Sequence, residues 1–214
     1  MIMINYFLMA IMGYLIGSLP TAYLFLKYFK NTDIREEGSG NVGTLNSLRV
    51  SKSKTLALIV LLIDFSKGLI SVWLAWQLFG ENFLTGGVAL LFAVIGHCYS
   101  VWINFKGGRG LATTGGGGIL LASPVILLWI IFWIAVYLYK KNIHFASAAS
   151  SIFTGILSIT SAKYLNEWSR FPSEHLTQFT VLIVLILAVI LIQHLPSLIS
   201  YFREQTKNLR GNRL

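Results

Sequence analysis

The chain has 214 residues, a net charge of +9, a mean hydropathy of +0.69 and only 12% charged residues. Soluble domains carry about 25% charged residues, so the composition excludes a soluble protein and indicates a polytopic helical membrane protein. In such a protein, excess Lys and Arg report topology and contact with anionic membrane lipid, and they are no argument for nucleic-acid binding. The polar loops are too short to fold alone, which predicts one domain over residues 1–214.

Apolar stretches separated by polar loops predict an all-α membrane bundle of about seven transmembrane helices, at roughly 20 residues for each crossing. In chain order they cover about residues 5–26, 55–79, 86–103, 111–122, 124–139, 147–164 and 177–201. The fourth and fifth are short because Ser123-Pro124 interrupts an apolar run that is too long for one crossing. Proline removes a helix hydrogen bond and favours extended structure before it, so a helical hairpin is expected.

The basic residues predict the orientation of these helices. With the N-terminus outside and the C-terminus cytoplasmic, the cations of loops 27–54 and 104–110, the pair at 140–141 and the tail all fall on the cytoplasmic side. The opposite loops keep only Lys163 and Arg170. A single span over residues 111–139 would break this asymmetry, which supports the hairpin.

The first polar loop combines glycines with cations in a pattern that favours phosphate. Arg35 and Arg49 enclose the glycines. A glycine-rich backbone can turn its N–H groups toward an anion, and arginine supplies full charge. The glycines are joined to Ser39, Asn41, Thr44 and Asn46, whose side chains can form hydrogen bonds. The alternative is a solvated connector rich in turn residues; a dinucleotide-binding loop is excluded, because it would need a preceding strand.

The second polar loop has the same character and leads directly into a short helix. Lys106 and Arg109 enclose Gly107 and Gly108, and Gly110 precedes the helix. The free N–H groups and positive dipole at a helix start favour an anion. The alternative, in which both cations only extend to the lipid interface, does not explain the glycines.

Two further polar positions lie inside predicted spans. His97 is the nearest candidate for a general base, although a satisfied structural histidine is the alternative. Asp64 and Lys67 share a helix face, and charges inside a membrane must pair or face a polar cavity; structural pairing is favoured. Cys98 is the only cysteine, and the histidines lack metal-ligand spacing, so no disulfide, metal or cofactor is predicted.

Together these motifs resemble the bacterial integral-membrane acyl-phosphate:glycerol-3-phosphate acyltransferases over nearly the whole chain. The matching segments are Gly17-Ser18-Leu19-Pro20-Thr21-Ala22-Tyr23, Gly38-Ser39-Gly40-Asn41-x-Gly43 with Asn46 and Arg49, Asp64-x-x-Lys67-Gly68, Gly96-His97, Phe105-Lys106-Gly107-Gly108-Arg109-Gly110-Leu111-Ala112-Thr113 and Ser147-x-x-Ser150. The segment that begins at Phe105 is the most specific of them.

The resemblance implies a seven-span enzyme of the bacterial cytoplasmic membrane. Such an enzyme transfers an acyl chain from acyl phosphate to the 1-hydroxyl of glycerol 3-phosphate, gives lysophosphatidic acid, and needs no cofactor. Carried over by position, the acceptor phosphate is held by Arg49, Lys106 and Ser147. The acyl phosphate is held by Ser39, Gly40, Asn41, Gly43, Asn46, Gly107, Gly108, Arg109 and Gly110. The catalytic set is His97, Lys106 and Ser39.

The chain departs from the family pattern in its tail, where Phe202 and Gln205 stand in place of a histidine and an asparagine. A relative that uses another phosphorylated acceptor is therefore an open alternative. A transporter of phosphorylated solutes is another, because discontinuous helices with glycine loops occur there too. No inverted repeat is visible, however, and the polar residues cluster on one face.

Overall fold

The computed structural model describes residues 2–211, and every regular element in that range is a helix. The elements are α1 Ile2–Ser18, α2 Thr21–Lys30, α3 Thr44–Ser51, α4 Lys54–Phe79, α5 Phe83–Cys98, η1 Val101–Ile103, α6 Leu111–Leu121, α7 Ser123–Lys140, α8 Ile143–Thr160, α9 Ala162–Glu167 and α10 Leu176–Gly211. The predicted all-α membrane bundle is confirmed.

Six stretches of the described chain are long and apolar enough to cross a membrane. They are Met3–Lys30, Lys54–Phe79, Phe83–Ile103, Ser123–Lys140, Ile143–Thr160 and Leu176–Arg203. The remaining apolar helix, α6, has 11 residues and measures about 16 Å, whereas the hydrocarbon core is about 30 Å thick. The fourth predicted crossing, over residues 111–122, is therefore a half-length helix inside the bundle.

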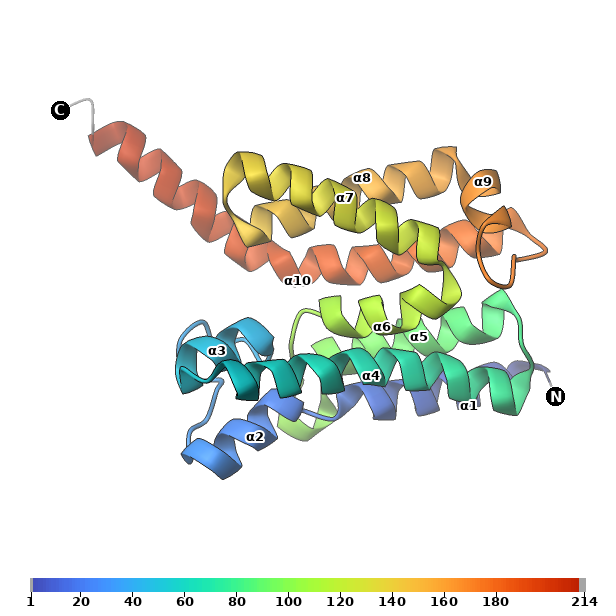
Figure 1. Ribbon diagram of the computed structural model, residues 1–214, viewed down its shortest axis with the longest axis horizontal. Coiled ribbons are helices and arrows are strands. Elements are labelled where there is room, and N and C mark those ends of the chain that lie inside the picture. The colour runs from blue at the N-terminus through green and yellow to red at the C-terminus, as the bar shows by residue number, and fades with distance from the viewer. Residues whose placement is uncertain (1, 212–214) are drawn as a thin grey trace.

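The predicted hairpin is formed by α6 and α7. Figure 1 shows α6 running beside α4 and α7 returning in the opposite direction above it. The two helices meet at Ala122, and Pro124 lies in the first turn of α7. Proline is tolerated there because its missing N–H has no partner in a helix start anyway.

The first span differs from the prediction, because it is two helices and not one. Helix α1 ends at Ser18 and α2 begins at Thr21, so Leu19 and Pro20 form a break. At the break the Leu19 carbonyl oxygen accepts a hydrogen bond of 3.0 Å from the Thr21 N–H and one of 2.5 Å from Lys67 Nζ on α4. An unwound backbone in the membrane thus provides a partner for a buried cation.

Glycines bring helix backbones into direct contact. A Cβ atom on Gly17 of α1 would lie 2.0 Å from the Ala93 carbonyl oxygen of α5. A Cβ atom on Gly116 of α6 would lie 1.9 Å from the Phe65 carbonyl oxygen of α4. Small residues at helix interfaces are typical of membrane bundles, and here they allow close packing of α1 on α5 and of α6 on α4.

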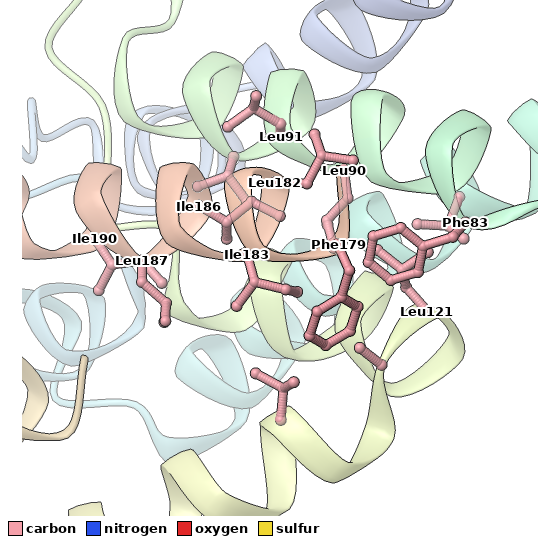
Figure 2. Close-up of a cluster of buried hydrophobic side chains, with 14 of the residues drawn as sticks. Phe83, Leu90, Leu91, Leu121, Phe179, Leu182, Ile183, Ile186, Leu187 and Ile190 are labelled. Atoms are coloured by element: carbon pink, nitrogen blue, oxygen red, sulfur yellow. The ribbon is translucent and has the colours of Figure 1, made fainter. Parts of the chain in front are cut away.

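Helix α10 joins the two halves of the bundle. One half contains α1, α4, α5 and α6, and the other contains α7, α8 and α10 (Figure 1). Figure 2 shows Phe179, Ile183 and Ile186 of α10 in one apolar cluster with Leu90 of α5 and Leu121 of α6. This cluster surrounds the apolar cavity described below.

The predicted basic loops gather at one end of the bundle. Helices α2 and α3, the start of α8 and the later part of α10 lie at that end, on the left of Figure 1, and the N-terminus lies at the other. The side chains of Lys207, Arg210 and Arg213, which the sequence also assigns to the basic end, lie outside the described residues. The polar connector predicted over residues 27–54 contains a helix, α3, which carries part of the site.

Candidate active site

The first polar loop is held in shape by Asn46 of α3. The buried Asn46 Oδ1 accepts a hydrogen bond of 2.9 Å from the Ser39 backbone N–H, and Nδ2 donates to the carbonyls of Ile34 and Glu37 at 3.2 and 3.0 Å. Gly38, with φ +61°, adopts the left-handed conformation that lets the loop close over this amide. The amide oxygen and nitrogen of Asn46 are thus both hydrogen-bonded within the loop, so the role of Asn46 is to position Ser39.

Arg35 is also committed within this loop. It forms an ion pair of 2.6 Å with Asp33 and lies 4.9 Å from the centre of the Tyr23 ring. Its hydrogen bond lowers the pKa of Asp33 to about 2, and the carboxylate raises the pKa of Arg35. Because its charge is paired with Asp33, Arg35 stabilises the loop itself. Arg49, on the other side of the glycines in the sequence, is exposed.

The second polar loop folds back onto the end of α5 and contacts the first. The N–H groups of Gly107 and Gly108 donate to the carbonyls of Cys98 and His97 at 3.1 and 3.0 Å. The Gly107 carbonyl accepts a hydrogen bond of 3.4 Å from the Val42 N–H. The structure therefore brings the two glycine loops side by side.

The His97 ring packs against the second loop. Its Nδ1 lies 3.8 Å from Asp64 Oδ1, and the same carboxylate forms a 2.6 Å ion pair with Lys67. A Cβ atom on Gly108 would lie 2.1 Å from His97 Nε2, so the ring packs directly under the loop. The predicted pairing of Asp64 with Lys67 is confirmed. His97 lines a small inner cavity with this pair and does not line the larger polar cavity.

A polar cavity of about 390 Å³ opens where the two loops meet α3 and α8. Its lining residues are Ser39 and Asn41 of the first loop, Leu45, Asn46, Leu48 and Arg49 of α3, Arg109 of the second loop, and Ile143 and His144 of α8. Two guanidinium groups with hydroxyl and amide neighbours favour a phosphate or carboxylate ligand.

Arg109 is fixed in this cavity by two contacts that the sequence does not predict. Its Nη1 donates to His144 Nδ1 at 3.1 Å, and its Nη2 donates to Ser197 Oγ at 2.8 Å. Burial and the nearby charge of Arg49 lower the pKa of Arg109, although a guanidinium stays protonated. Two cations held together without a carboxylate between them are stabilised by a bound anion.

Two residues predicted for the acceptor phosphate lie outside the cavity lining. Lys106 is exposed in the second loop. Ser147 is buried, and its Oγ donates to the Ile143 carbonyl at 2.9 Å and accepts from Trp133 Nε1 at 3.1 Å. His144 lines the cavity in place of Ser147. Residues three apart on a helix share a face, so the position of Ser147 could have pointed to His144.

The tail residue Phe202 is 53% exposed and packs with aromatic rings. Its ring centroid lies 6.1 Å from that of Phe145 and 5.5 Å from that of Tyr201. It does not line the polar cavity.

An apolar cavity of about 220 Å³ follows α6 from Leu111 to Leu121. Residues of α4, α5, α7 and α10 complete its lining, and Ile183 and Ile186 of α10 are seen in Figure 2. Arg109 lines the polar cavity and Leu111 the apolar one, so residues on either side of Gly110 in the sequence belong to different cavities. A ligand that fits both cavities has an anionic head and an apolar chain.

Among the side chains that the structure describes, no three of His, Cys, Asp or Glu lie close enough together to hold a metal ion.

Known proteins resemble this chain in sequence and in structure. Residues 7–204 match the family model described as glycerol-3-phosphate acyltransferase. Glycerol-3-phosphate acyltransferase 2 of Moorella thermoacetica is 39% identical over 150 residues, which cover 70% of this chain and 75% of that protein. The glycerol-3-phosphate acyltransferase of Ehrlichia chaffeensis is 38% identical over 148 residues, covering 69% and 74%.

A solved structure extends this similarity to the fold. The crystal structure of PlsY (YgiH), an integral membrane glycerol 3-phosphate acyltransferase in its glycerol 3-phosphate form, superposes with a TM-score of 0.72 at 28% identity. The match covers 97% of this chain and 93% of that one. The chain therefore belongs to the glycerol-3-phosphate acyltransferase family.

Proposed function

We propose that this protein transfers a fatty acyl group from acyl phosphate to the 1-hydroxyl of glycerol 3-phosphate, giving lysophosphatidic acid and inorganic phosphate. The observation that carries the proposal is that Arg109 lines a cationic cavity and Leu111, two residues later, lines an apolar one. Acyl phosphate has the matching shape, with an anionic head on an apolar chain. PlsY, the solved relative, has been crystallised in glycerol 3-phosphate and lysophosphatidic acid forms, which supports this acceptor and product.

The reaction needs little more than placement and charge neutralisation. The carbonyl of acyl phosphate is already activated as a mixed anhydride. The acceptor oxygen attacks the carbonyl carbon, the bond from that carbon to the phosphate oxygen breaks, and the hydroxyl proton passes to a phosphate oxygen. Positioning of two bound reactants and fixed positive charge near the leaving phosphate are the main contributions required of the protein.

The geometry favours a particular division of roles. Arg49 and Arg109 hold the phosphate groups, with Ser39 and Asn41 as further hydrogen-bonding groups of the same cavity. Lys106, at the exposed edge of the second loop, reaches the ligand through its flexible stem. Ser147 acts as a positioning residue, because its hydroxyl is already bonded to Ile143 and Trp133. His97 supports the second loop from beneath Gly108.

The site is proposed to face the cytoplasm of a bacterial inner membrane, with the N-terminus outside. The support is the gathering of the basic segments at the end of the bundle that holds the polar cavity (Figure 1). The same cations would contact anionic lipid head groups. The relatives from Moorella and Ehrlichia are bacterial proteins.

An assay with purified protein in proteoliposomes tests the function. With palmitoyl phosphate and glycerol 3-phosphate, we expect lysophosphatidic acid and inorganic phosphate in a one-to-one ratio, without added metal or cofactor. Glycerol, which lacks the phosphate that Arg49 and Arg109 would bind, should be a much poorer acceptor. Consumption of palmitoyl phosphate without acylation of glycerol 3-phosphate would reject the acceptor, and no consumption would reject the enzyme.

A further inference from the structure

One buried hydroxyl beside the apolar cavity has no hydrogen-bond partner among the described residues. Thr114 of α6 is 8% exposed, and its Oγ1 has no partner among the described residues. Most other buried helical hydroxyls among the described residues bond to carbonyls, as Ser150 does to Ala146 and Thr113 does to Asp64, and Thr21 and Thr154 are the exceptions. Buried polar groups are nearly always paired, so the free Thr114 hydroxyl calls for an external partner.

The position of Thr114 restricts the kind of partner. Of the described residues that line the apolar cavity, Thr114 alone carries a hydroxyl. The other polar group there, the indole N–H of Trp129, already donates to Ser151 at 3.1 Å. The cavity therefore presents one free donor among apolar side chains, which suits a single oxygen atom on an otherwise apolar ligand.

The position of Thr114 along α6 points to one oxygen atom of an acyl phosphate. Thr114 lies four residues beyond Gly110, or about 6 Å from it along the axis of α6. In an acyl phosphate the carbonyl directly follows the phosphate, and the hydrocarbon chain begins after it. With the phosphate on the polar side of Gly110 and the chain along α6, the carbonyl oxygen enters the apolar cavity beside the first turn of α6.

We propose that the Thr114 hydroxyl donates a hydrogen bond to the carbonyl oxygen of the bound acyl phosphate, an inference that rests on the proposed function. This oxygen gains negative charge when the acceptor attacks the carbonyl carbon. A donor fixed in a dry cavity stabilises that charge more than it stabilises the neutral carbonyl, so it lowers the barrier. The positive end of the α6 dipole adds to the effect. Thr114 is then a catalytic residue that acts after both substrates are bound.

The chain offers a matched pair of variants for the test. Thr114→Val removes the hydroxyl and keeps the shape of the side chain, and Thr114→Ser keeps the hydroxyl. Thr154→Val is the control, because the Thr154 hydroxyl is also buried without a partner but lies on α8 and does not line the apolar cavity. Removing an unpaired buried hydroxyl costs no hydrogen bond, so both valine variants should fold.

The measurements are the single-turnover rate of acyl transfer from palmitoyl phosphate and the infrared carbonyl band of bound, carbonyl-labelled palmitoyl phosphate. We expect Thr114→Val to slow transfer about ten- to a hundredfold and to shift the carbonyl band to higher wavenumber. The KM for glycerol 3-phosphate should not change, and Thr114→Ser and Thr154→Val should resemble the unmodified protein.

The outcomes distinguish a failure of the Thr114 role from a failure of the proposed acyltransferase function. Equal rates and equal carbonyl bands for Thr114→Val and Thr154→Val, in an active protein, would overturn the role of Thr114 and leave the acyltransferase intact. An unmodified protein that does not consume palmitoyl phosphate would reject the proposed function, and the role of Thr114 with it.

Discussion

Arg109→Ala is expected to lower kcat/KM for acyl transfer by roughly a hundredfold, because a charge-assisted hydrogen bond contributes about 1.5–3 kcal/mol. Arg109 is the cation of the second loop that lines the polar cavity, and His144 and Ser197 hold it at 3.1 and 2.8 Å. Its loss removes positive charge from the proposed phosphate site and frees α8 and α10 from the loop. The measurement is steady-state kinetics in proteoliposomes with palmitoyl phosphate and glycerol 3-phosphate.

Three control variants divide this effect into charge and position. Arg109→Lys keeps the charge but not the forked contact with His144 and Ser197, so about a tenfold loss is expected. Ser197→Ala removes only one of those contacts and should have a smaller effect. Lys30→Ala changes an exposed cation outside both loops and should leave the rate unchanged. If Arg109→Ala is as active as Lys30→Ala, Arg109 does not bind substrate.

Gly108→Ala is expected to abolish most activity, with a loss of more than about a hundredfold. The added Cβ atom would lie 2.1 Å from His97 Nε2 and 2.8 Å from the Val42 carbonyl oxygen, so either the ring or the first loop must move. A displacement of about 1 Å in a positioned catalytic group can cost a hundredfold in rate. Activity and thermal stability should be measured on the same detergent-purified sample.

Gly155→Ala on α8 is the control for Gly108→Ala, because Gly155 lines neither the polar nor the apolar cavity. Its Cβ atom would meet only the Leu187 side chain at 3.8 Å, an ordinary contact, so activity and stability should stay near those of the unmodified protein. Full activity of Gly108→Ala would show that the packing of His97 beneath the second loop is irrelevant to the reaction.

The breaks between helices show which parts of the fold a sequence can predict. The break between α6 and α7 is predictable, because Pro124 follows a stretch too long for one crossing. The break at Pro20 is not, because apolar residues continue on both sides of it and the run has the length of one crossing. The interaction that uses this break, from Lys67 to the Leu19 carbonyl, joins residues 48 positions apart.

The residues of the site can also be divided into those that local sequence patterns predict and those that they do not. The glycines and cations of the two loops are local signals, and the structure does bring the loops together. His144 and Ser197 were missed because they contact Arg109 across 35 and 88 residues of sequence, and neither belongs to a glycine loop. The amide of Asn46 suggests a ligand by type, yet three hydrogen bonds within the first loop commit it to the backbone.

One lipid substrate is expected to occupy both cavities, with its head on the polar side of Gly110 and its chain along α6. Photocrosslinking can locate it, with a non-hydrolysable palmitoyl phosphonate that carries a diazirine in the middle of its chain and with peptide mass spectrometry of the products. We expect labelling of cavity residues such as Leu121, Ile183 and Ile186, which unlabelled palmitoyl phosphate should suppress. Suppressible labelling confined to the exposed face of α7, at Ile131 or Leu138, would contradict it.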